Sequence, residues 1–503
     1  MGGERISIGC LPDSGRSIKG KEQRNYMDIN AIKAVYFVGA GGIGMSALIR
    51  YFLAKGKRVG GYDRTSSELT EELRREGADI HYEDDMAQVA DAFKSPADTL
   101  VVYTPAVPES HTELTYFRSN GFEVMKRARV LGEITRSARG LCVAGTHGKT
   151  TTSSMIAHLL KQSHVDCNAF LGGILKNYES NLMLSDKSDL TVIEADEFDR
   201  SFHWLTPYMA VITAVDPDHL DIYGTPEAYR ESFEKFTSLI RPDGVLLMKQ
   251  GLRLTPRLQS GVKCYTYAAE RNAESQPSTV NCQLSASPDF YAGNIRIGNG
   301  NIRFDFVGPD IRIADVDLGV PVWINIENGV AAMAIAWLNG VTPEELRRGM
   351  ATFAGPRRRF DFHLKTDRMA LIDDYAHHPA ELRQSILSVR ALYPGRKLTG
   401  IFQPHLYSRT RDFAAEFAAS LSLLDELILL DIYPAREQPI PGVTSRIIFD
   451  RVTIPDKKLC RKEELLDLLA KGRYEVVLML GAGDIERLVE PVRELLCEQM
   501  ERS

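Results

Sequence analysis

Twice in this chain an apolar strand-like segment leads into a glycine-rich loop that precedes a helix-like segment. Ala34–Val38 leads into Gly39–Gly44, and Leu141–Ala144 leads into Gly145–Thr151. Glycines let the backbone approach a phosphate group closely, and the N-terminus of the following helix presents free N–H groups to it. Such units build parallel sheets, so we expect an α/β protein that binds phosphorylated ligands.

The chain has 503 residues, which is enough for about two to four domains. The alternation of strands and helices predicts three α/β units. We place them at residues 27–136, 137–354 and 355–503. Apolar and polar residues alternate between 270 and 315, and this predicts a β-hairpin insertion in the second unit. Residues 1–26 lack an apolar segment and precede Met27, so we expect a flexible leader there.

The composition argues against several partners. Hydrophobic residues make up 44% of the chain, charged residues 25%, and the net charge is −6. This balance is typical of a globular protein and gives no reason to expect a nucleic acid or a membrane as a partner. Seven cysteines occur singly, so we expect no disulfide framework and a reducing, cytoplasmic location. We expect a monomer or a homodimer.

The first glycine loop has the spacing of a dinucleotide-binding motif. Gly39, Gly41 and Gly44 follow a strand, and Asp63 ends the next strand, where a carboxylate accepts hydrogen bonds from ribose hydroxyls. The usual ligand is NAD or FAD, and a tight packing turn is the alternative without a ligand. Any nucleoside diphosphate fits the same geometry, so the loop alone leaves its ligand open.

The second glycine loop, at residues 145–150, ends in the GKT of a P-loop. The full pattern requires glycine at position 143, where this chain has Val143, so the loop is a shortened variant. Its chemistry is complete, because backbone N–H groups surround the phosphates, Lys149 offsets their charge and the Thr150 hydroxyl reaches Mg²⁺. A chance GKT is the alternative, which the preceding strand and the following helix disfavour.

Polar residues follow two further strands of the second unit and open one of its helices. Glu194–Glu197 and Asp216–Asp221 lie at strand ends, where carboxylates hold Mg²⁺ beside a phosphate loop; solvated acidic loops are the alternative. Asn325 and Asn328 begin an apolar helix. Their amides either read the edge of an adenine or cap the helix, and both interpretations stay open.

Two polar clusters follow neighbouring strands of the third unit, Asp373–Pro379 and Gln403–Arg411. We expect them at one edge of a sheet. The adjacent His377 and His378 do not favour zinc, because no third ligand stands at the usual spacing. Arginines such as Arg409 clamp phosphate or carboxylate groups by paired hydrogen bonds, and a plain charged surface is the alternative.

Together these motifs resemble the Mur ligases. The resemblance spans about residues 33–490 and rests on GAGGIGMS, GTHGKTTT, EADE, DPDHLDIYG, RRRFD, DDYAHHPAE, FQPHLYSRTRDF and GAGD in this order. It implies a Rossmann-like UDP-binding domain, a central P-loop ATPase-like domain with a β insertion, and a C-terminal Rossmann-like α/β domain that closes over the site with the amino acid.

The resemblance also implies roles for individual residues. The residues for the UDP-sugar are Gly41, Gly42, Ile43, Gly44 and Asp63. The residues for ATP are Gly145, Thr146, Gly148, Lys149, Thr150, Thr151, Asn325, Asn328, Arg359 and Asp374. The Mg²⁺ ligands are Thr150, Glu194 and His219. The residues at the amino-acid end are Tyr375, His377, His405 and Arg409. Those implied to be catalytic are Lys149, His219, Arg359 and His377.

Within the family, the chain is most similar to the members that use ATP and Mg²⁺ to attach L-alanine to the lactyl carboxylate of UDP-N-acetylmuramate. That reaction passes through an acyl phosphate and serves peptidoglycan precursor biosynthesis. A recycling ligase, which joins a preformed tripeptide to the same sugar, is the nearest alternative. An NAD-dependent dehydrogenase, which leaves the GKT loop unused, and a non-catalytic nucleotide switch are the others.

The chain departs from the family pattern at two places near the expected site. Val322–Ile324 stand where many members have Gly-Arg-His, so we expect a different wall for the adenine pocket. Leu406 stands where many alanine-attaching members have arginine, which leaves part of the contact with the amino acid open.

Overall fold

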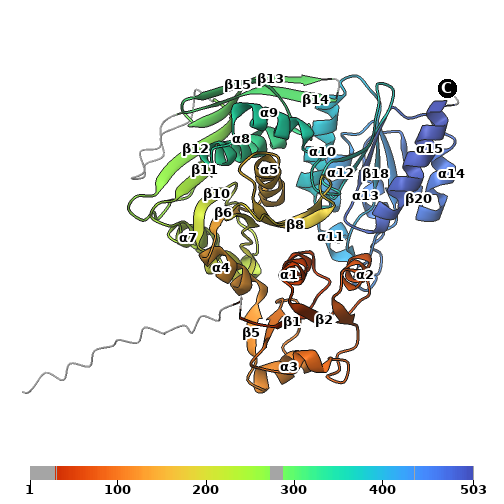
Figure 1. Cartoon of the computed structure of the whole chain (residues 1–503). Coiled ribbons are helices and arrows are strands. Elements are labelled where there is room, and N and C mark those ends of the chain that lie inside the picture. Colours follow the sequence, from red (N-terminus) through yellow and green to blue (C-terminus); the bar gives the residue numbers. More distant parts are fainter. Residues whose placement is uncertain (1–28, 30, 272–286, 299, 436, 502–503) are drawn as a thin grey trace, which may run out of the picture.

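The strands of the computed structural model form three separate sheets (Figure 1). The structure describes residues 29, 31–271, 287–298, 300–435 and 437–501. The predicted leader, residues 1–26, lies outside this part of the chain. Among the helices that the structure describes, none is long and apolar enough to cross a membrane.

The first sheet is parallel throughout, with the strand order β3-β2-β1-β4-β5. Its strands are β1 (Ala34–Val38), β2 (Arg58–Tyr62), β3 (Asp79–His81), β4 (Thr99–Tyr103) and β5 (Glu123–Lys126). Its helices are α1 (Ile43–Ala54), α2 (Glu68–Arg75), α3 (Thr112–Ser119) and α4 (Arg127–Arg136). The strand order reverses between β1 and β4, and open parallel sheets bind ligands at such a point. The first glycine loop follows β1 and therefore lies there.

The central sheet has ten strands in the order β15-β14-β13-β12-β11-β10-β6-β9-β7-β8, and only its two edges are antiparallel. The strands are β6 (Arg139–Ala144), β7 (Asn168–Leu175), β8 (Ser180–Met183), β9 (Leu190–Glu194), β10 (Pro207–Ile212), β11 (Val245–Lys249), β12 (Lys263–Glu270), β13 (Phe290–Gly298), β14 (Asn301–Gly308) and β15 (Ile311–Asp317). The helices are α5 (Lys149–Lys161), α6 (Leu220–Tyr223), α7 (Pro226–Thr237), α8 (Trp323–Leu338) and α9 (Pro343–Thr352).

The β insertion is larger than the predicted hairpin. β13, β14 and β15 form an antiparallel meander, and β13 pairs in parallel with β12, so the insertion extends the central sheet. Alternation of apolar and polar residues indicates strands with one buried face, but it fixes neither how many strands pair nor which edge they join.

The third sheet has the order β16-β17-β21-β18-β19-β20 and is parallel except at β16. Its strands are β16 (Asp361–Lys365), β17 (Ala370–Asp374), β18 (Leu398–Phe402), β19 (Glu426–Leu430), β20 (Lys457–Cys460) and β21 (Val476–Leu480). Its helices are α10 (Pro379–Leu392), α11 (Tyr407–Asp412), α12 (Ala414–Leu421), α13 (Arg446–Phe449), α14 (Leu465–Leu469) and α15 (Val489–Glu501). β17 and β18 flank β21, so both polar clusters of the third unit lie at one edge.

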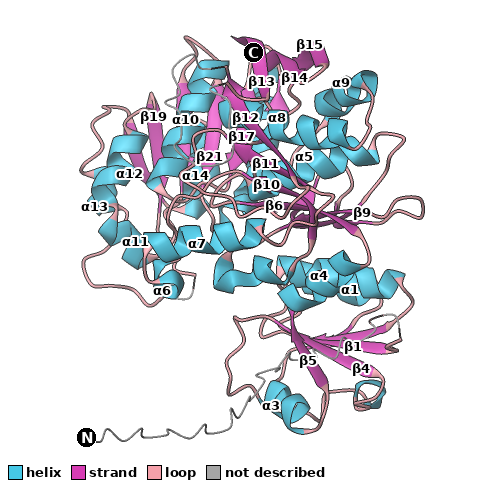
Figure 2. Ribbon diagram, turned by 90° about the vertical axis from the view of Figure 1, so that its left-hand side faces the viewer, coloured by secondary structure: helices cyan, strands magenta, loops and turns pink. Residues whose placement is uncertain are grey.

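The three units meet around the β7–β8 hairpin. Helices α1 and α4 lie between the first and the central sheet (Figure 2), and apolar side chains of both units form one continuous core there. At the turn of the hairpin, Lys176 donates to Asp361 of the third unit at 2.5 Å. The hairpin therefore touches the first unit with its strands and the third unit with its turn. The domain limits at 136 and 355 stay predictions.

Candidate active site

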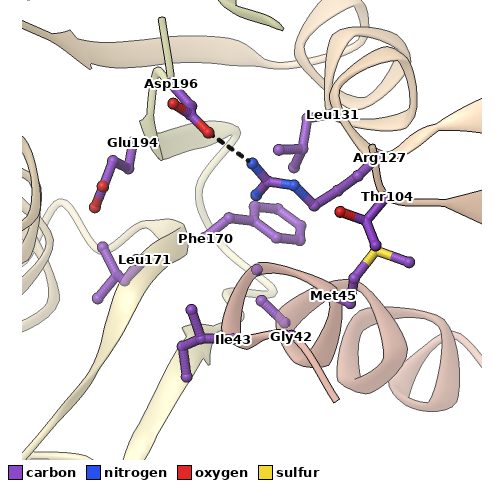
Figure 3. Close-up of a pocket in the computed structure, with 13 residues that line it drawn as sticks. Gly42, Ile43, Met45, Thr104, Arg127, Leu131, Phe170, Leu171, Glu194 and Asp196 are labelled. Atoms are coloured by element: carbon purple, nitrogen blue, oxygen red, sulfur yellow. Dashed lines mark hydrogen bonds and ion pairs between the residues drawn. The ribbon is translucent and has the colours of Figure 1, made fainter. Parts of the chain in front are cut away.

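A cavity of about 310 Å³ lies between the first glycine loop and the ends of β7 and β9 (Figure 3). Gly42 and Gly44 form one wall, whereas Phe170 and Glu194 belong to the opposite wall. Arg127, the first residue of α4, also lines the cavity, and its guanidinium lies 3.5 Å from the carboxylate of Asp196. The cavity thus joins a loop of the first unit to acidic groups of the second.

The first glycine loop is closed by the carboxylate that follows β2. The Oδ2 atom of Asp63 accepts a hydrogen bond from the N–H of Gly41 at 2.7 Å, and Oδ1 accepts one from Thr65 at 3.1 Å. A β-carbon at Gly41 would approach Oδ2 to 2.9 Å. Asp63, predicted to contact a ribose, therefore also shapes the loop. No side chain caps α1 at Gly42, so the N–H groups of Ile43 and Gly44 stay available to an anion.

The second glycine loop is held by residues that follow β10. Gly148 is the N-cap of α5 and has a φ of 81°, a left-handed conformation that favours glycine. The Thr213 hydroxyl donates to the carbonyl of His147, and the Thr146 hydroxyl donates to the carbonyl of Asp216 at 2.7 Å. Like α1, α5 begins without a side-chain cap. The loop has the form of an anion-binding helix N-terminus.

Lys149 is paired with Glu197, a residue whose role the sequence did not reveal. The Lys149 ammonium lies 2.9 Å from the carboxylate of Glu197 and 2.6 Å from the carbonyl of Gly145. Burial raises the pKa of Glu197 above its ordinary value, and the neighbouring Lys149 ammonium offsets part of this rise. Glu197 lies in the EADE segment, in which only Glu194 was predicted to have a role. The three acidic residues of this segment could have suggested a partner for the lysine.

Glu194 and Thr150 together form a group that fits a divalent cation. Burial raises the pKa of the Glu194 carboxyl above its ordinary value. The hydrogen bond from Thr150 and the charges of Lys149 and Arg359 oppose this rise. The Oε2 atom of Glu194 is buried without a hydrogen-bond partner among the described residues. A β-carbon at Gly172 would come within 2.2 Å of that oxygen. A hydroxyl and an orphaned carboxylate oxygen beside a phosphate loop suit Mg²⁺.

His219, the third predicted metal ligand, packs elsewhere in this structure. Its ring lies edge-on to Phe198 at 5.1 Å, and its Nε2 atom is 3.8 Å from Asp218. No contact between His219 and Glu194 occurs in the described part of the chain. Within that part no three His, Cys, Asp or Glu side chains are grouped as a metal site. A Mg²⁺ ion at Glu194 would therefore take its remaining ligands from phosphate and water.

Asn325 and Asn328 lie beneath the second glycine loop and do not cap α8. Val322 is the N-cap of that helix and makes no side-chain capping bond. Asn325 donates to the carbonyl of Val320 at 3.1 Å, and Asn328 donates to Asn325 at 3.1 Å. A β-carbon at Gly148 would meet Asn328 Oδ1 at 2.9 Å. The alternative that they cap α8 was wrong, because both side-chain amides form hydrogen bonds with other residues of the fold next to the second glycine loop.

The predicted residues of the third unit gather at one place. The Tyr375 ring lies 5.7 Å from the Arg359 guanidinium and 5.2 Å from the His377 ring, which in turn lies 5.9 Å from His405. Burial lowers the pKa of His377 below its ordinary value, the neighbouring Glu381 opposes this shift, and the Arg409 and Arg359 charges add to it. His377 is therefore neutral at neutral pH.

The arginines of the third unit differ in their partners. Arg358 donates to Glu486 at 2.8 Å and to the carbonyl of Gly481 at 2.6 Å, so it is committed to the fold. Arg359 is exposed and forms no ion pair with a described residue. The Nη1 atom of Arg409 is buried and lacks a hydrogen-bond partner among the residues placed by the structure. Among the described arginines of the predicted site, Arg359 and Arg409 thus keep donors free for a ligand.

Asp374 bonds inside its own unit rather than toward the second glycine loop. Its carboxylate accepts hydrogen bonds from the Ser385 hydroxyl and, at 3.3 Å, from the N–H of Phe360. Burial raises the pKa of Asp374. Its predicted contact with ATP stays a prediction.

Three family models match the chain in the order of its three units. Residues 34–139 match the Mur ligase family, catalytic domain; residues 143–336 match the Mur ligase middle domain; and residues 358–483 match the Mur ligase, glutamate ligase domain. The UDP-N-acetylmuramate–L-alanine ligase of Parabacteroides distasonis is 80% identical over 95% of this chain and 100% of its own length. The ligase of the same name from Phocaeicola vulgatus is 64% identical over 93% and 99%.

Solved structures agree with this result. The UDP-N-acetylmuramate-alanine ligase MurC from Thermotoga maritima superposes with a TM-score of 0.73 at 25% identity, covering 93% of this chain and 99% of that one. A murein peptide ligase from Psychrobacter arcticus has the same fold, with a TM-score of 0.60 at 19% identity over 92% and 98%. The resemblance and the three-domain α/β fold are confirmed, and the chain belongs to the Mur ligase family.

Proposed function

We propose that the protein uses ATP to join L-alanine to the lactyl carboxylate of UDP-N-acetylmuramate. The observation that carries this proposal is the cavity between the first glycine loop and Glu194, with Gly42 and Gly44 on one side and the Glu194 carboxylate, which lies beside Thr150 of the second loop, on the other. A nucleotide sugar held at the first loop directs its acidic end toward the phosphates held at the second. The highly identical relatives are named for this reaction.

The first step brings two anions together. A lactyl carboxylate oxygen attacks the γ-phosphorus of ATP, the bond from that phosphorus to the β,γ-bridging oxygen breaks, and ADP leaves with the bond's electrons. Lys149 at the P-loop and the unpaired Arg359 supply positive charge at the phosphates. Thr150 and Glu194 would hold Mg²⁺, which neutralises charge on the phosphate oxygens.

The second step forms the amide bond. The neutral amine of L-alanine attacks the carbonyl carbon of the acyl phosphate, and phosphate leaves. His377 is neutral at neutral pH and is placed beside Tyr375 and His405, so we assign it to accept a proton at the amino-acid end. The free Nη1 donor of Arg409 suits the carboxylate of the amino acid.

The alternatives explain fewer of these observations. A dehydrogenase would use the first loop and leave Lys149, Thr150 and Glu194 without a ligand. A tripeptide-recycling ligase shares the nucleotide sites, and a peptide ligase of known structure matches less closely than the alanine ligase. We place the reaction in the cytoplasm, where ATP and UDP-sugars are made.

Oxygen transfer tests the acyl phosphate directly. UDP-N-acetylmuramate labelled with ¹⁸O in its lactyl carboxylate should yield phosphate that carries one ¹⁸O atom, because the carboxyl oxygen leaves with the phosphate. Release of unlabelled phosphate together with the amide product would overturn the mechanism.

A further inference from the structure

Asn181 of the central domain is fully buried where that domain meets the first one. It lies on β8 and reaches the first turn of α1, the helix that starts at the first glycine loop. Its Nδ2 atom donates to the carbonyl of Ile43 at 2.6 Å and to the hydroxyl of Ser46 at 3.0 Å. The side-chain amide of Asn181, in the second domain, therefore donates to two groups in the first turn of α1.

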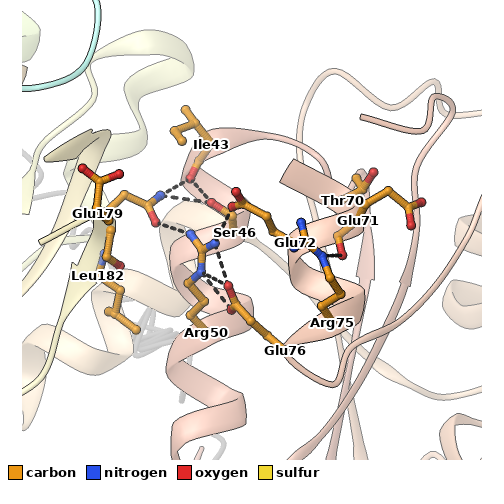
Figure 4. Close-up of polar contacts among 12 residues, drawn as sticks. Ile43, Ser46, Arg50, Thr70, Glu71, Glu72, Arg75, Glu76, Glu179 and Leu182 are labelled. Atoms are coloured by element: carbon orange, nitrogen blue, oxygen red, sulfur yellow. Dashed lines mark hydrogen bonds and ion pairs between the residues drawn. The ribbon is translucent and has the colours of Figure 1, made fainter. Parts of the chain in front are cut away.

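The oxygen of the same amide is held by Arg50 of the first domain, which Figure 4 shows beside Ser46 and Glu76. The Oδ1 atom of Asn181 accepts a hydrogen bond from Arg50 at 3.1 Å. Arg50 in turn donates to Glu76 at 2.8 Å and to Glu72 at 3.2 Å, and only 12% of its side chain is exposed. We call Asn181, Ile43, Ser46 and Arg50 the Asn181 clamp.

The Asn181 clamp lies directly behind the cavity. β8 pairs with β7, where Leu182 stands opposite Phe170, and Phe170 lines the cavity. Ile43 is part of the opposite wall. The Asn181 clamp thus joins β8, the neighbour of the strand in one wall, to α1 in the opposite wall. The rings of Tyr51 and Phe170 also meet beside the clamp, 5.4 Å apart, and such an apolar contact sets no register.

We propose that Asn181 is a positioning residue that sets the first glycine loop at its working distance from the phosphate site at Glu194. The inference rests on the proposed function. Phosphoryl transfer to the lactyl carboxylate requires the two reacting groups in near-attack geometry, and a displacement of about 1 Å costs about a hundredfold in rate. Asn181 is fully buried and does not line the cavity, so it acts through Ile43 and Ser46.

The chemistry requires an amide at this position. The Ser46 hydroxyl gives its proton to the Ile43 carbonyl at 2.8 Å, so the Ser46 oxygen can only accept, and Asn181 supplies its donor from the facing strand. A carboxylate at 181 would still pair with Arg50 but would offer no donor to either oxygen. The buried Ser46 oxygen would then lack a donor, which destabilises the first turn of α1 in its present position.

The test compares Asn181→Ala with Asn168→Ala in the full-length enzyme. Asn168, on β7, also donates two hydrogen bonds and accepts one, but all its partners lie within the central domain. We expect Asn181→Ala to raise the KM and the calorimetric Kd for UDP-N-acetylmuramate about tenfold or more and to lower kcat, with the KM for ATP changed less than twofold. Asn168→Ala should change none of these more than twofold.

Ser46→Ala supplies a milder change to the same clamp. We expect it to raise the KM for the UDP-sugar about threefold, and the double variant Asn181→Ala/Ser46→Ala to be no worse than Asn181→Ala alone, because both remove one interaction. A soluble Asn181→Ala enzyme with unchanged UDP-sugar Kd would overturn the inference. If that variant does not fold, an unchanged KM in Ser46→Ala overturns it instead.

The two proposals fail in different ways. A wild-type chain that binds UDP-N-acetylmuramate but releases no phosphate with L-alanine contradicts the proposed function, and the Kd comparison still tests the clamp. An active wild type with an unaltered Asn181→Ala Kd contradicts the clamp alone. Absence of UDP-sugar binding by the wild type contradicts both.

Discussion

The ammonium of Lys149 lies 2.9 Å from both carboxylate oxygens of Glu197, a side chain that is almost completely buried. The lysine is thereby folded back over its own loop, where it also donates to the carbonyl of Gly145. A phosphate that enters the loop competes with Glu197 for this charge. The ion pair keeps the lysine ordered at the site before the nucleotide binds.

Replacing this lysine should separate chemistry from binding of the sugar. We expect Lys149→Ala to abolish ADP release, since charge on the γ-phosphate is no longer offset. Binding of UDP-N-acetylmuramate, measured by calorimetry, should survive, because the first glycine loop belongs to another domain. Turnover near the wild-type rate in Lys149→Ala would contradict the assignment of the P-loop.

The carboxylate at the end of β9 should control the requirement for metal. Glu194→Gln removes the orphaned anionic oxygen, and we expect the Mg²⁺ concentration for half-maximal activity to rise about tenfold or more. Glu227→Gln, on the surface of α7, serves as the control because Glu227 is exposed and pairs with Arg230. An unchanged Mg²⁺ titration in Glu194→Gln would remove this residue from the metal site.

The free guanidinium donor in the third domain should recognise the amino acid. Arg409→Lys keeps the charge and loses the planar fork, so we expect the KM for L-alanine to rise about tenfold while the KM for the UDP-sugar stays within twofold. Arg411→Lys is the matched control, since Arg411 is exposed and pairs with Asp412. Equal effects in both variants would argue against a specific carboxylate contact.

A buried carboxyl far from the site should govern the pH dependence of stability. Glu113 is fully buried beside Tyr36 and His81, with Asp84 nearby, and burial raises its pKa to about 7. Between its ordinary value of 4.5 and pH 7 the folded chain binds more protons than the unfolded chain, so stability falls as pH rises.

Glu113→Gln should remove that fall. We expect the free energy of unfolding of the variant, relative to wild type, to improve by about 2 kcal/mol between pH 5 and pH 8 in urea titrations. Asp91→Asn is the control, because the Asp91 side chain is 97% exposed. A constant difference between Glu113→Gln and wild type across this range would show that Glu113 does not titrate there.

Local patterns predicted much of the fold and of the site. Both glycine loops, the strands around them and the residues Lys149, Thr150 and Glu194 follow from short runs of sequence, because a strand, its loop and the next helix are contiguous. The structure places Thr150 beside Glu194 and gathers Tyr375, His377 and His405, as strand ends of one sheet edge predict.

The remaining features depend on which elements become neighbours. Arg127 and Asn181 acquire their partners only when α4 and β8 meet the other unit, and Glu197 acquires its partner only when the segment after β9 lies beside the second glycine loop. No local spacing encodes those contacts. The meander that extends the central sheet was missed for a different reason, since alternation of apolar and polar residues does not fix how many consecutive strands pair. The role of His219 at a metal stays a prediction.

Phosphate release by the purified chain tests the proposed reaction most directly. With UDP-N-acetylmuramate, ATP and Mg²⁺ present, we predict rapid release with L-alanine, slower release with L-serine or glycine, and background release without an amino acid. Release that depends on the preformed tripeptide, or that does not depend on any amino acid, would contradict an alanine-adding ligase.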